Sequence, residues 1–108
     1  MNYSVFTTDN FEKEAKRLIK KYASLKSEIA VLINDLQNNP TQGDHVNSNV
    51  YKIRIAVASK GKGKRGGARV MTFVKVIAQE VYLFSIYSKG EKDDISQLEI
   101  KSLIQDIL

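Results

Sequence analysis

The sequence contains no cysteine, one proline and one histidine. Without cysteine the chain has no disulfide, no thiolate nucleophile and no Cys-ligated zinc site. Of its 108 residues, 43% are hydrophobic and 27% are charged, which is the ordinary balance of a folded globular protein. We expect a single domain over residues 1–108, because this length supports one hydrophobic core and not two.

Long apolar runs are also missing. No stretch approaches the length of a membrane span, and the first nine residues are too polar for a signal peptide. The sequence therefore predicts a soluble, cytoplasmic protein that does not contact a membrane.

The most informative absence is that of acidic residues between His45 and Gln79. This window holds eight basic residues, whereas the rest of the chain has nine basic and twelve acidic residues. A concentrated positive field attracts polyanions, so the window predicts an anion-binding surface, and RNA is the favoured partner. The eight are Lys52, Arg54, Lys60, Lys62, Lys64, Arg65, Arg69 and Lys75.

Common catalytic motifs are not found. There is no Gly-x-Ser-x-Gly, no Walker loop and no His-Glu-x-x-His. The spacing of Gly61, Gly63 and Gly66 formally matches a dinucleotide fingerprint, but it joins two expected strands and does not open a helix. The single histidine, His45, lies in a polar segment and is expected to be a surface residue. We predict no metal and no cofactor.

Hydrophobic periodicity predicts two helices near the N-terminus. A short strand over 3–7 precedes a helix over about 10–22, with Asp9 and Glu12 as a capping box. Ser24 is expected to cap a second helix, which ends before Pro40. A polar connection without apolar anchors follows over 41–49.

Apolar residues that alternate with basic or polar ones, together with runs of β-forming residues, predict strands over 50–57, 68–76 and 80–87. These strands are expected to form an antiparallel meander. The glycine-rich run over 60–67 reads as a mobile basic loop between the first two of them. Ser96 and Glu99 form a capping box for a short last helix. The predicted fold is α+β: an antiparallel sheet of about four strands, with two N-terminal helices packed on one face and a short C-terminal helix.

Basic side chains on these strands suggest a phosphate site. Lys52 and Arg54 are two residues apart and share a face, as do Arg69 and Lys75 if no bulge intervenes. Such cations can cleave RNA without a metal, because the 2′-OH of RNA is itself a nucleophile. Arginine holds phosphate oxygens, a lysine of lowered pKa can act as a base, and Tyr87 can stack on a base or donate a hydrogen bond. Binding without catalysis explains the same residues.

Two strings carry a resemblance to a known family. Tyr51-Lys52-Ile53-Arg54 is followed by Gly-Lys-Gly-Lys-Arg-Gly-Gly-Ala-Arg-Val over 61–70, and later by Tyr-Ser-Lys-Gly-Glu-Lys-Asp-Asp over 87–94. Over residues 50–95 the chain resembles the HigB branch of the RelE toxin superfamily. The resemblance implies a compact sheet with two N-terminal helices. It also implies a ribosome-dependent endoribonuclease that cuts mRNA in the ribosomal A site through the 2′-OH and leaves a cyclic phosphate.

The resemblance also implies site residues and partners. Arg69 is the strongest match and the strongest candidate for catalysis. The concentrated basic charge, apart from the resemblance, makes Lys60, Lys62, Lys64, Arg65 and Lys75 candidates for RNA binding. The partners implied are the ribosome with mRNA and a cognate antitoxin, a small helix-turn-helix protein through which the complex contacts operator DNA. The other candidate catalytic residues are Lys52, Arg54, Tyr87, Lys89 and Lys92.

Two alternatives to the nuclease stay open from the sequence. One is a non-catalytic RNA- or ribosome-binding protein, and the other is a gyrase-targeting toxin of the same superfold. We place the chemistry on the strands, because strand residues hold a phosphate more precisely than a flexible loop does. The loop then binds RNA through its positive charge and takes no part in the cleavage step.

Overall fold

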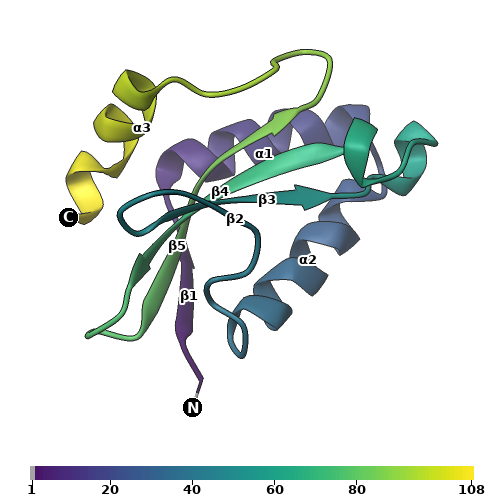
Figure 1. Cartoon of the computed structure of the whole chain (residues 1–108). Helices are drawn as coiled ribbons and strands as arrows, with labels where there is room; N and C mark the ends of the chain where they lie inside the picture. Colours follow the sequence, from purple (N-terminus) through teal and green to yellow (C-terminus); the bar gives the residue numbers. More distant parts are fainter. Residues whose placement is uncertain (1) are drawn as a thin grey trace.

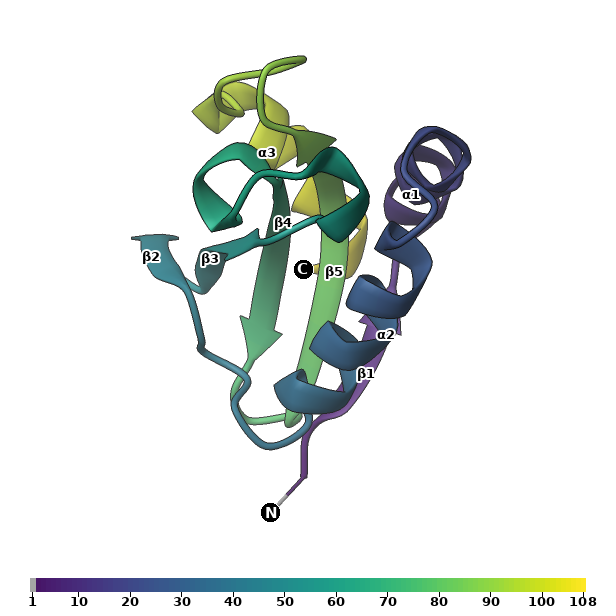
Figure 2. The same ribbon diagram turned by 90° about the vertical axis from the view of Figure 1, so that its right-hand side faces the viewer.

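The computed structural model describes residues 2–108 and shows a five-stranded sheet with helices on both faces (Figure 1). Helices α1 (Asp9–Lys21) and α2 (Leu25–Leu36) cover one face, and α3 (Gln97–Ile104) covers the other (Figure 2). The α+β fold expected from the sequence is confirmed. The strands are β1 (Ser4–Thr7), β2 (Asp44–Asn47), β3 (Val50–Ile55), β4 (Ala68–Lys75) and β5 (Glu80–Ser88), and the 3₁₀ turns are η1 (Ala58–Lys60), η2 (Lys64–Gly66) and η3 (Gln105–Ile107).

The strands lie in the order β1-β5-β4-β3-β2. The predicted antiparallel meander is confirmed in β3, β4 and β5. Two details of the prediction were wrong: the sheet has five strands instead of about four, and it is mixed because β1 pairs in parallel with β5. The chain passes through α1, α2 and three further strands before it reaches β5, and a short strand alone does not show the direction in which it will pair.

The additional strand, β2, lies in the segment predicted to be a polar connection. It pairs antiparallel with the start of β3, with Asp44 opposite Lys52 and His45 opposite Tyr51. Its residues are mostly exposed, so it lacks the apolar alternation that marks a half-buried strand. This edge strand brings an acidic residue next to the basic face of β3.

The capping predictions were partly right. Thr8, and not Asp9, caps α1: its hydroxyl accepts a hydrogen bond from the Phe11 amide at 3.2 Å. Ser24 makes no capping bond in α2, because its own backbone is already helical. Ser96 caps α3 as predicted and accepts from the Glu99 amide at 3.1 Å.

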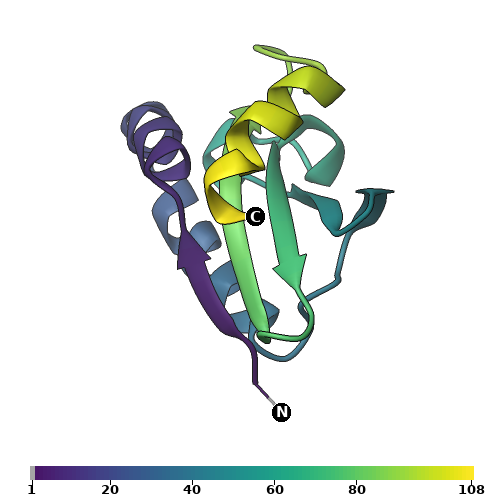
Figure 3. The same ribbon diagram turned by 90° about the vertical axis from the view of Figure 1, so that its left-hand side faces the viewer.

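Two hydrophobic cores fill the two faces of the sheet. Under α1 and α2 the core includes Phe11, Leu18 and Leu25 with the inward residues of the strands. Under α3 a second core forms around Met71, Phe84 and other residues of β4 and β5 (Figure 3). Figure 3 shows α3 crossing this face of β4 and β5 with its C-terminal end toward β1.

A bulge in β5 is held by α1. The register between β4 and β5 shifts after Met71, and β1 ends opposite Leu83, so the outer edge of β5 is unpaired beyond that point. Glu14 fills this edge, since its carboxylate accepts from the Ser85 hydroxyl at 2.8 Å and from the Ile86 amide at 3.2 Å. These bonds fix the part of β5 that leads to Tyr87.

None of the helices within residues 2–108 is both long enough and apolar enough to cross a membrane.

Candidate functional site

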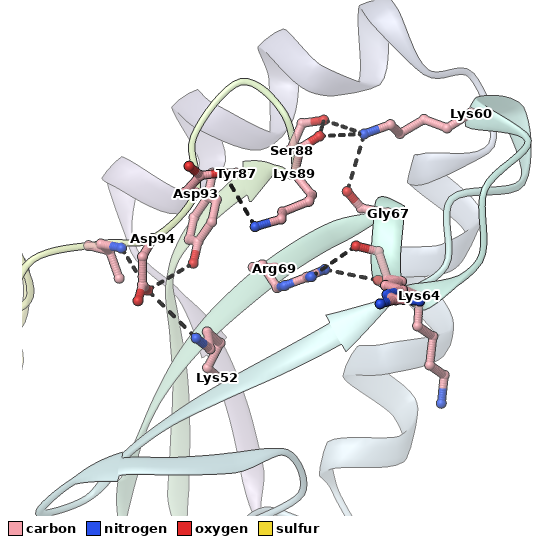
Figure 4. Close-up of polar contacts among 12 residues, drawn as sticks. Lys52, Lys60, Lys64, Gly67, Arg69, Tyr87, Ser88, Lys89, Asp93 and Asp94 are labelled. Atoms are coloured by element: carbon pink, nitrogen blue, oxygen red, sulfur yellow. Dashed lines mark hydrogen bonds and ion pairs between the residues drawn. The ribbon is translucent and has the colours of Figure 1, made fainter.

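The register of the sheet aligns three of the predicted site residues in one row. Arg54 on β3 lies opposite Arg69 on β4, and Arg69 lies opposite Tyr87 on β5. Lys52 is two residues before Arg54 and therefore shares its face. The loop after β5 adds Lys89 (Figure 4). We call these five residues the strand-end site, because they gather where β3 and β5 end and β4 begins.

Arg69 is the most buried member of the site, with 6% of its surface exposed. Its guanidinium donates to the Lys64 carbonyl at 2.9 Å and to the Arg65 carbonyl at 3.1 Å (Figure 4). A planar fork of donors can hold two acceptors at once, which an ammonium cannot do with the same geometry. Arg69 therefore ties the basic loop to the sheet as well as contributing charge.

Lys52 and Tyr87 meet at a carboxylate that the sequence analysis did not place in the site. The Lys52 ammonium lies 3.6 Å from Asp94, and the Tyr87 hydroxyl donates to the same Asp94 oxygen at 3.4 Å. The pKa of Tyr87 is raised to about 12, mainly by burial and secondly by the negative charge of Asp94. Tyr87 is thus a neutral hydrogen-bond donor at physiological pH.

Asp94 remains ionised in this arrangement. The Ile95 amide donates to its carboxylate at 2.8 Å and lowers its pKa, and Lys52 and Tyr87 lower the pKa further.

Two other cations of the site, Arg54 and Lys89, are also paired with carboxylates, and so is Lys92 nearby. Arg54 pairs with Asp44 across β2 and β3. Lys89 lies 3.3 Å from Asp93, and Lys92 lies 2.8 Å from Glu99. Two cations of the window without acidic residues, Lys52 and Arg54, therefore have carboxylate partners from outside it, Asp94 and Asp44.

The basic loop is more ordered than the mobile segment that the sequence predicted. It contains η1 and η2, and Val57 bridges Lys62. The Glu28 carboxylate of α2 accepts from the Ala58 amide at 2.8 Å, which ties the loop to that helix. At Gly67 a Cβ atom would lie 2.0 Å from the Ile55 carbonyl oxygen, so only glycine fits this approach of the backbone.

Lys60 differs from the other basic residues of the loop. Its ammonium donates to the Ser88 hydroxyl at 2.8 Å and to the Lys89 carbonyl at 2.9 Å, and it lies over the Tyr22 ring (Figure 4). Lys62, Lys64 and Arg65 are exposed, and the ammonium of Lys64 points away from Arg69. The three exposed residues are available to an external anion, whereas Lys60 braces the loop against β5.

Lys75 lies apart from the strand-end site. It is six residues along β4 from Arg69, which at about 3.4 Å per residue separates the two by roughly 20 Å. Its ammonium lies over the Tyr82 ring, 5.3 Å from the centroid. One phosphate group cannot contact both Arg69 and Lys75.

His45 lies outside the strand-end site on the exposed strand β2. Its Nε2 is 2.6 Å from the Ser48 carbonyl oxygen, and its ring is tilted against Tyr51. Across residues 2–108 no three His, Cys, Asp or Glu side chains are grouped so that they could hold a metal ion.

Comparison with known proteins identifies the family. The model for the RelE toxin of the RelE/RelB toxin–antitoxin system matches residues 3–106. The chain belongs to the RelE toxin family. As a RelE-family toxin of a toxin–antitoxin system, it has a cognate antitoxin as its implied partner.

Solved structures of RelE show the same fold. A double arginine-to-alanine mutant of the E. coli toxin RelE in the free state superposes with a TM-score of 0.65 at 14% identity, over 100% of both chains. The isolated E. coli RelE toxin gives a TM-score of 0.61 at 15% identity, over 98% of this chain and 99% of that one. At these identities the likeness extends to the fold and not to individual residues.

The residues that sequence reasoning missed are acidic or neutral. Asp94, Asp44 and Ser88 all contact predicted site cations, yet Lys52 and Asp94 are 42 positions apart in the sequence. Asp44 directly precedes the basic window, and its role becomes visible once β2 is known to pair with β3.

Proposed function

We propose that this toxin is an endoribonuclease of the HigB type that cuts mRNA in the ribosomal A site and so arrests translation. The observation that carries the proposal is the row of Arg54, Arg69 and Tyr87 across three strands, with Lys52 and Lys89 beside it. The row lies on a fold shared with RelE, at the end of the sheet where β3 and β5 end and β4 begins.

The cleavage needs no more than these side chains and the RNA itself. The 2′-oxygen of one nucleotide attacks the adjacent phosphorus, a new P–O bond forms, and the bond to the 5′-oxygen of the next nucleotide breaks. Arg69 and Arg54 offset the negative charge that builds up on the phosphate oxygens. Lys52 and Lys89 are the candidates for proton transfer, and neutral Tyr87 donates a hydrogen bond. Stacking of an RNA base on Tyr87, the other role expected from the sequence, does not fit a ring that is buried and covered by Lys92.

The remaining basic residues have supporting roles in this proposal. Lys62, Lys64 and Arg65 grip the phosphate backbone of ribosomal or messenger RNA. Lys60 braces the loop from behind, and Lys92, which lies over the Tyr87 ring, holds that side chain in place. Lys75 contacts RNA at a separate point. We expect the toxin to act in the cytoplasm and to contact operator DNA through its helix-turn-helix antitoxin.

Arg69→Ala tests the proposal in cells. We expect loss of growth inhibition and a fall in cleavage rate on the order of 10²–10³, because one charge contact to the transition state is removed. Primer extension on translated mRNA after induction should show codon-positioned cuts for the wild type and none for the variant. Lys13→Ala, which removes an exposed cation on α1, is the control and should keep its cuts.

Other outcomes separate the alternatives. If induction of the wild type yields no codon-positioned cuts, the site binds RNA without cleaving it. DNA-damage induction without mRNA cleavage would instead indicate a gyrase-targeting toxin. Full toxicity of a folded Arg69→Ala protein would remove this residue from the mechanism.

A further inference from the structure

Asp94 differs from the other carboxylates around the strand-end site. Asp44, Asp93 and Glu99 each pair with one cation in the described chain. Asp94 instead contacts two site residues from two different strands, Lys52 on β3 and Tyr87 on β5, through a single oxygen. It therefore bridges Lys52 and Tyr87 (Figure 4).

The chemistry of these contacts is that of a phosphate site. An ammonium and a phenolic hydroxyl both face one anionic oxygen, the first as an ion pair and the second as a hydrogen-bond donor. A phosphate oxygen would accept the same two groups. A phosphate and the Asp94 carboxylate cannot hold this position together, because both are negative and both need the same donors. One has to leave when the other binds.

The Asp94 side chain is free to leave without unfolding its surroundings. Its side chain is 67% exposed, whereas the neighbouring Ile95 is buried and anchors the chain to the core under α3. On the other side, Glu91 is held by Arg17 at 2.8 Å and by Lys21. The segment is thus fixed at both ends, and rotation of one exposed side chain suffices to uncover Lys52 and Tyr87.

We propose that the Asp94 carboxylate is an internal stand-in for an RNA phosphate, which occupies the place beside Lys52 and Tyr87 until the RNA displaces it. The inference rests on the proposed function, since it names a phosphate position within the same site. In the free toxin the carboxylate keeps Lys52 and Tyr87 oriented and lowers the attraction of the site for stray anions. Specific RNA must supply enough other contacts to replace it.

Asp94→Asn tests the proposal and preserves the fold, because the amide oxygen can still accept from the Ile95 amide. The probe is a short single-stranded 2′-O-methyl RNA, which cannot be cleaved, and fluorescence anisotropy measures its affinity without ribosomes. We expect about two- to fivefold tighter binding, the range of a partly exposed ion pair. Asp106→Asn changes the net charge equally on the last turn of the chain and should bind like the wild type.

A second measurement uses the unaltered toxin. In an NMR titration with the same oligonucleotide, the Ile95 amide should shift as its bond to Asp94 is disturbed. The proposal is overturned if Asp94→Asn binds no tighter than Asp106→Asn, if no variant binds the probe, or if the Ile95 amide stays unchanged at saturation. These readouts do not depend on cleavage, so absence of codon-positioned cuts would count against the proposed function alone.

Discussion

Tyr87 is a buried side chain whose hydroxyl is influenced by charges of both signs. Of its surface 4% is exposed, its hydroxyl faces Asp94, and Arg69 and Arg54 oppose the resulting rise of its pKa without cancelling it. Lys92 lies over its ring at 5.7 Å from the centroid. A side chain held in this way is a donor of fixed orientation and cannot serve as a base near neutral pH.

Alkaline titration should show this directly. Because the folded state raises the pKa of Tyr87 from about 10 to about 12, the protonated phenol stabilises the fold below pH 10, and that contribution is lost as the pH rises toward 12. Ultraviolet absorbance at 295 nm should reveal one of the five tyrosines ionising near pH 12. Tyr87→Phe should remove that step, while Tyr82, whose pKa is also raised by its bond to Glu80, still ionises late. An unchanged high-pH step in Tyr87→Phe, with Tyr82→Phe as the comparison, would contradict the assignment.

At this scale the sequence predicted cations better than their partners. Period-two spacing placed Lys52 and Arg54 on one face, and the register confirms that they lie opposite β4. The pairing of Lys52 with Asp94 depends on how the loop after β5 folds back, which local spacing does not show. The predicted positive face is therefore also a face with built-in counter-charges.

Among the elements, the basic loop departs most from its prediction. Many glycines and no apolar side chain predicted mobility, yet contacts from three sides hold the loop. Glu28 holds Ala58 from α2, Lys60 reaches Ser88 on β5, and Arg69 holds the Lys64 carbonyl from β4. Each partner is far from the loop in sequence or is polar, so no hydrophobic pattern reveals it.

Neutralising the exposed part of the loop should separate binding from chemistry. A Lys62→Gln, Lys64→Gln, Arg65→Gln variant should bind ribosomes more weakly. Because up to three phosphate contacts are lost, the slope of log affinity against log salt concentration should become shallower by about 2. The single-turnover cleavage rate at saturation should stay within about threefold of the wild type.

A control variant carries the same charge change on another surface. Replacing Lys13, Lys16 and Lys20 of α1 by glutamine removes three positive charges, and we expect a smaller change in slope from this variant. Unchanged ribosome affinity of the loop variant together with lost cleavage would place the chemistry in the loop after all.

For the molecule as a whole, the fold class followed from the sequence and the details of assembly did not. Two amphipathic helices and a meander specify an α+β arrangement because their apolar faces must be buried together. The parallel pairing of β1, the polar edge strand β2 and the placement of α3 on the second face depend on contacts between distant segments. The net charge of +5 is likewise arranged by the fold, which gathers Lys52, Arg54 and Arg69 at one end of the sheet and leaves Lys75 at the other.

We propose that the ribosome-bound toxin cleaves mRNA by using the RNA's own 2′-OH as the nucleophile. The most direct measurement uses purified toxin, ribosomes and an mRNA that places one defined codon in the A site, with a single 2′-deoxy nucleotide at the cut position in a matched mRNA. We predict cleavage of the all-ribose mRNA, with a cyclic phosphate on the upstream product, and no cleavage at that position in the deoxy mRNA. Equal cleavage of both mRNAs would contradict the proposed mechanism.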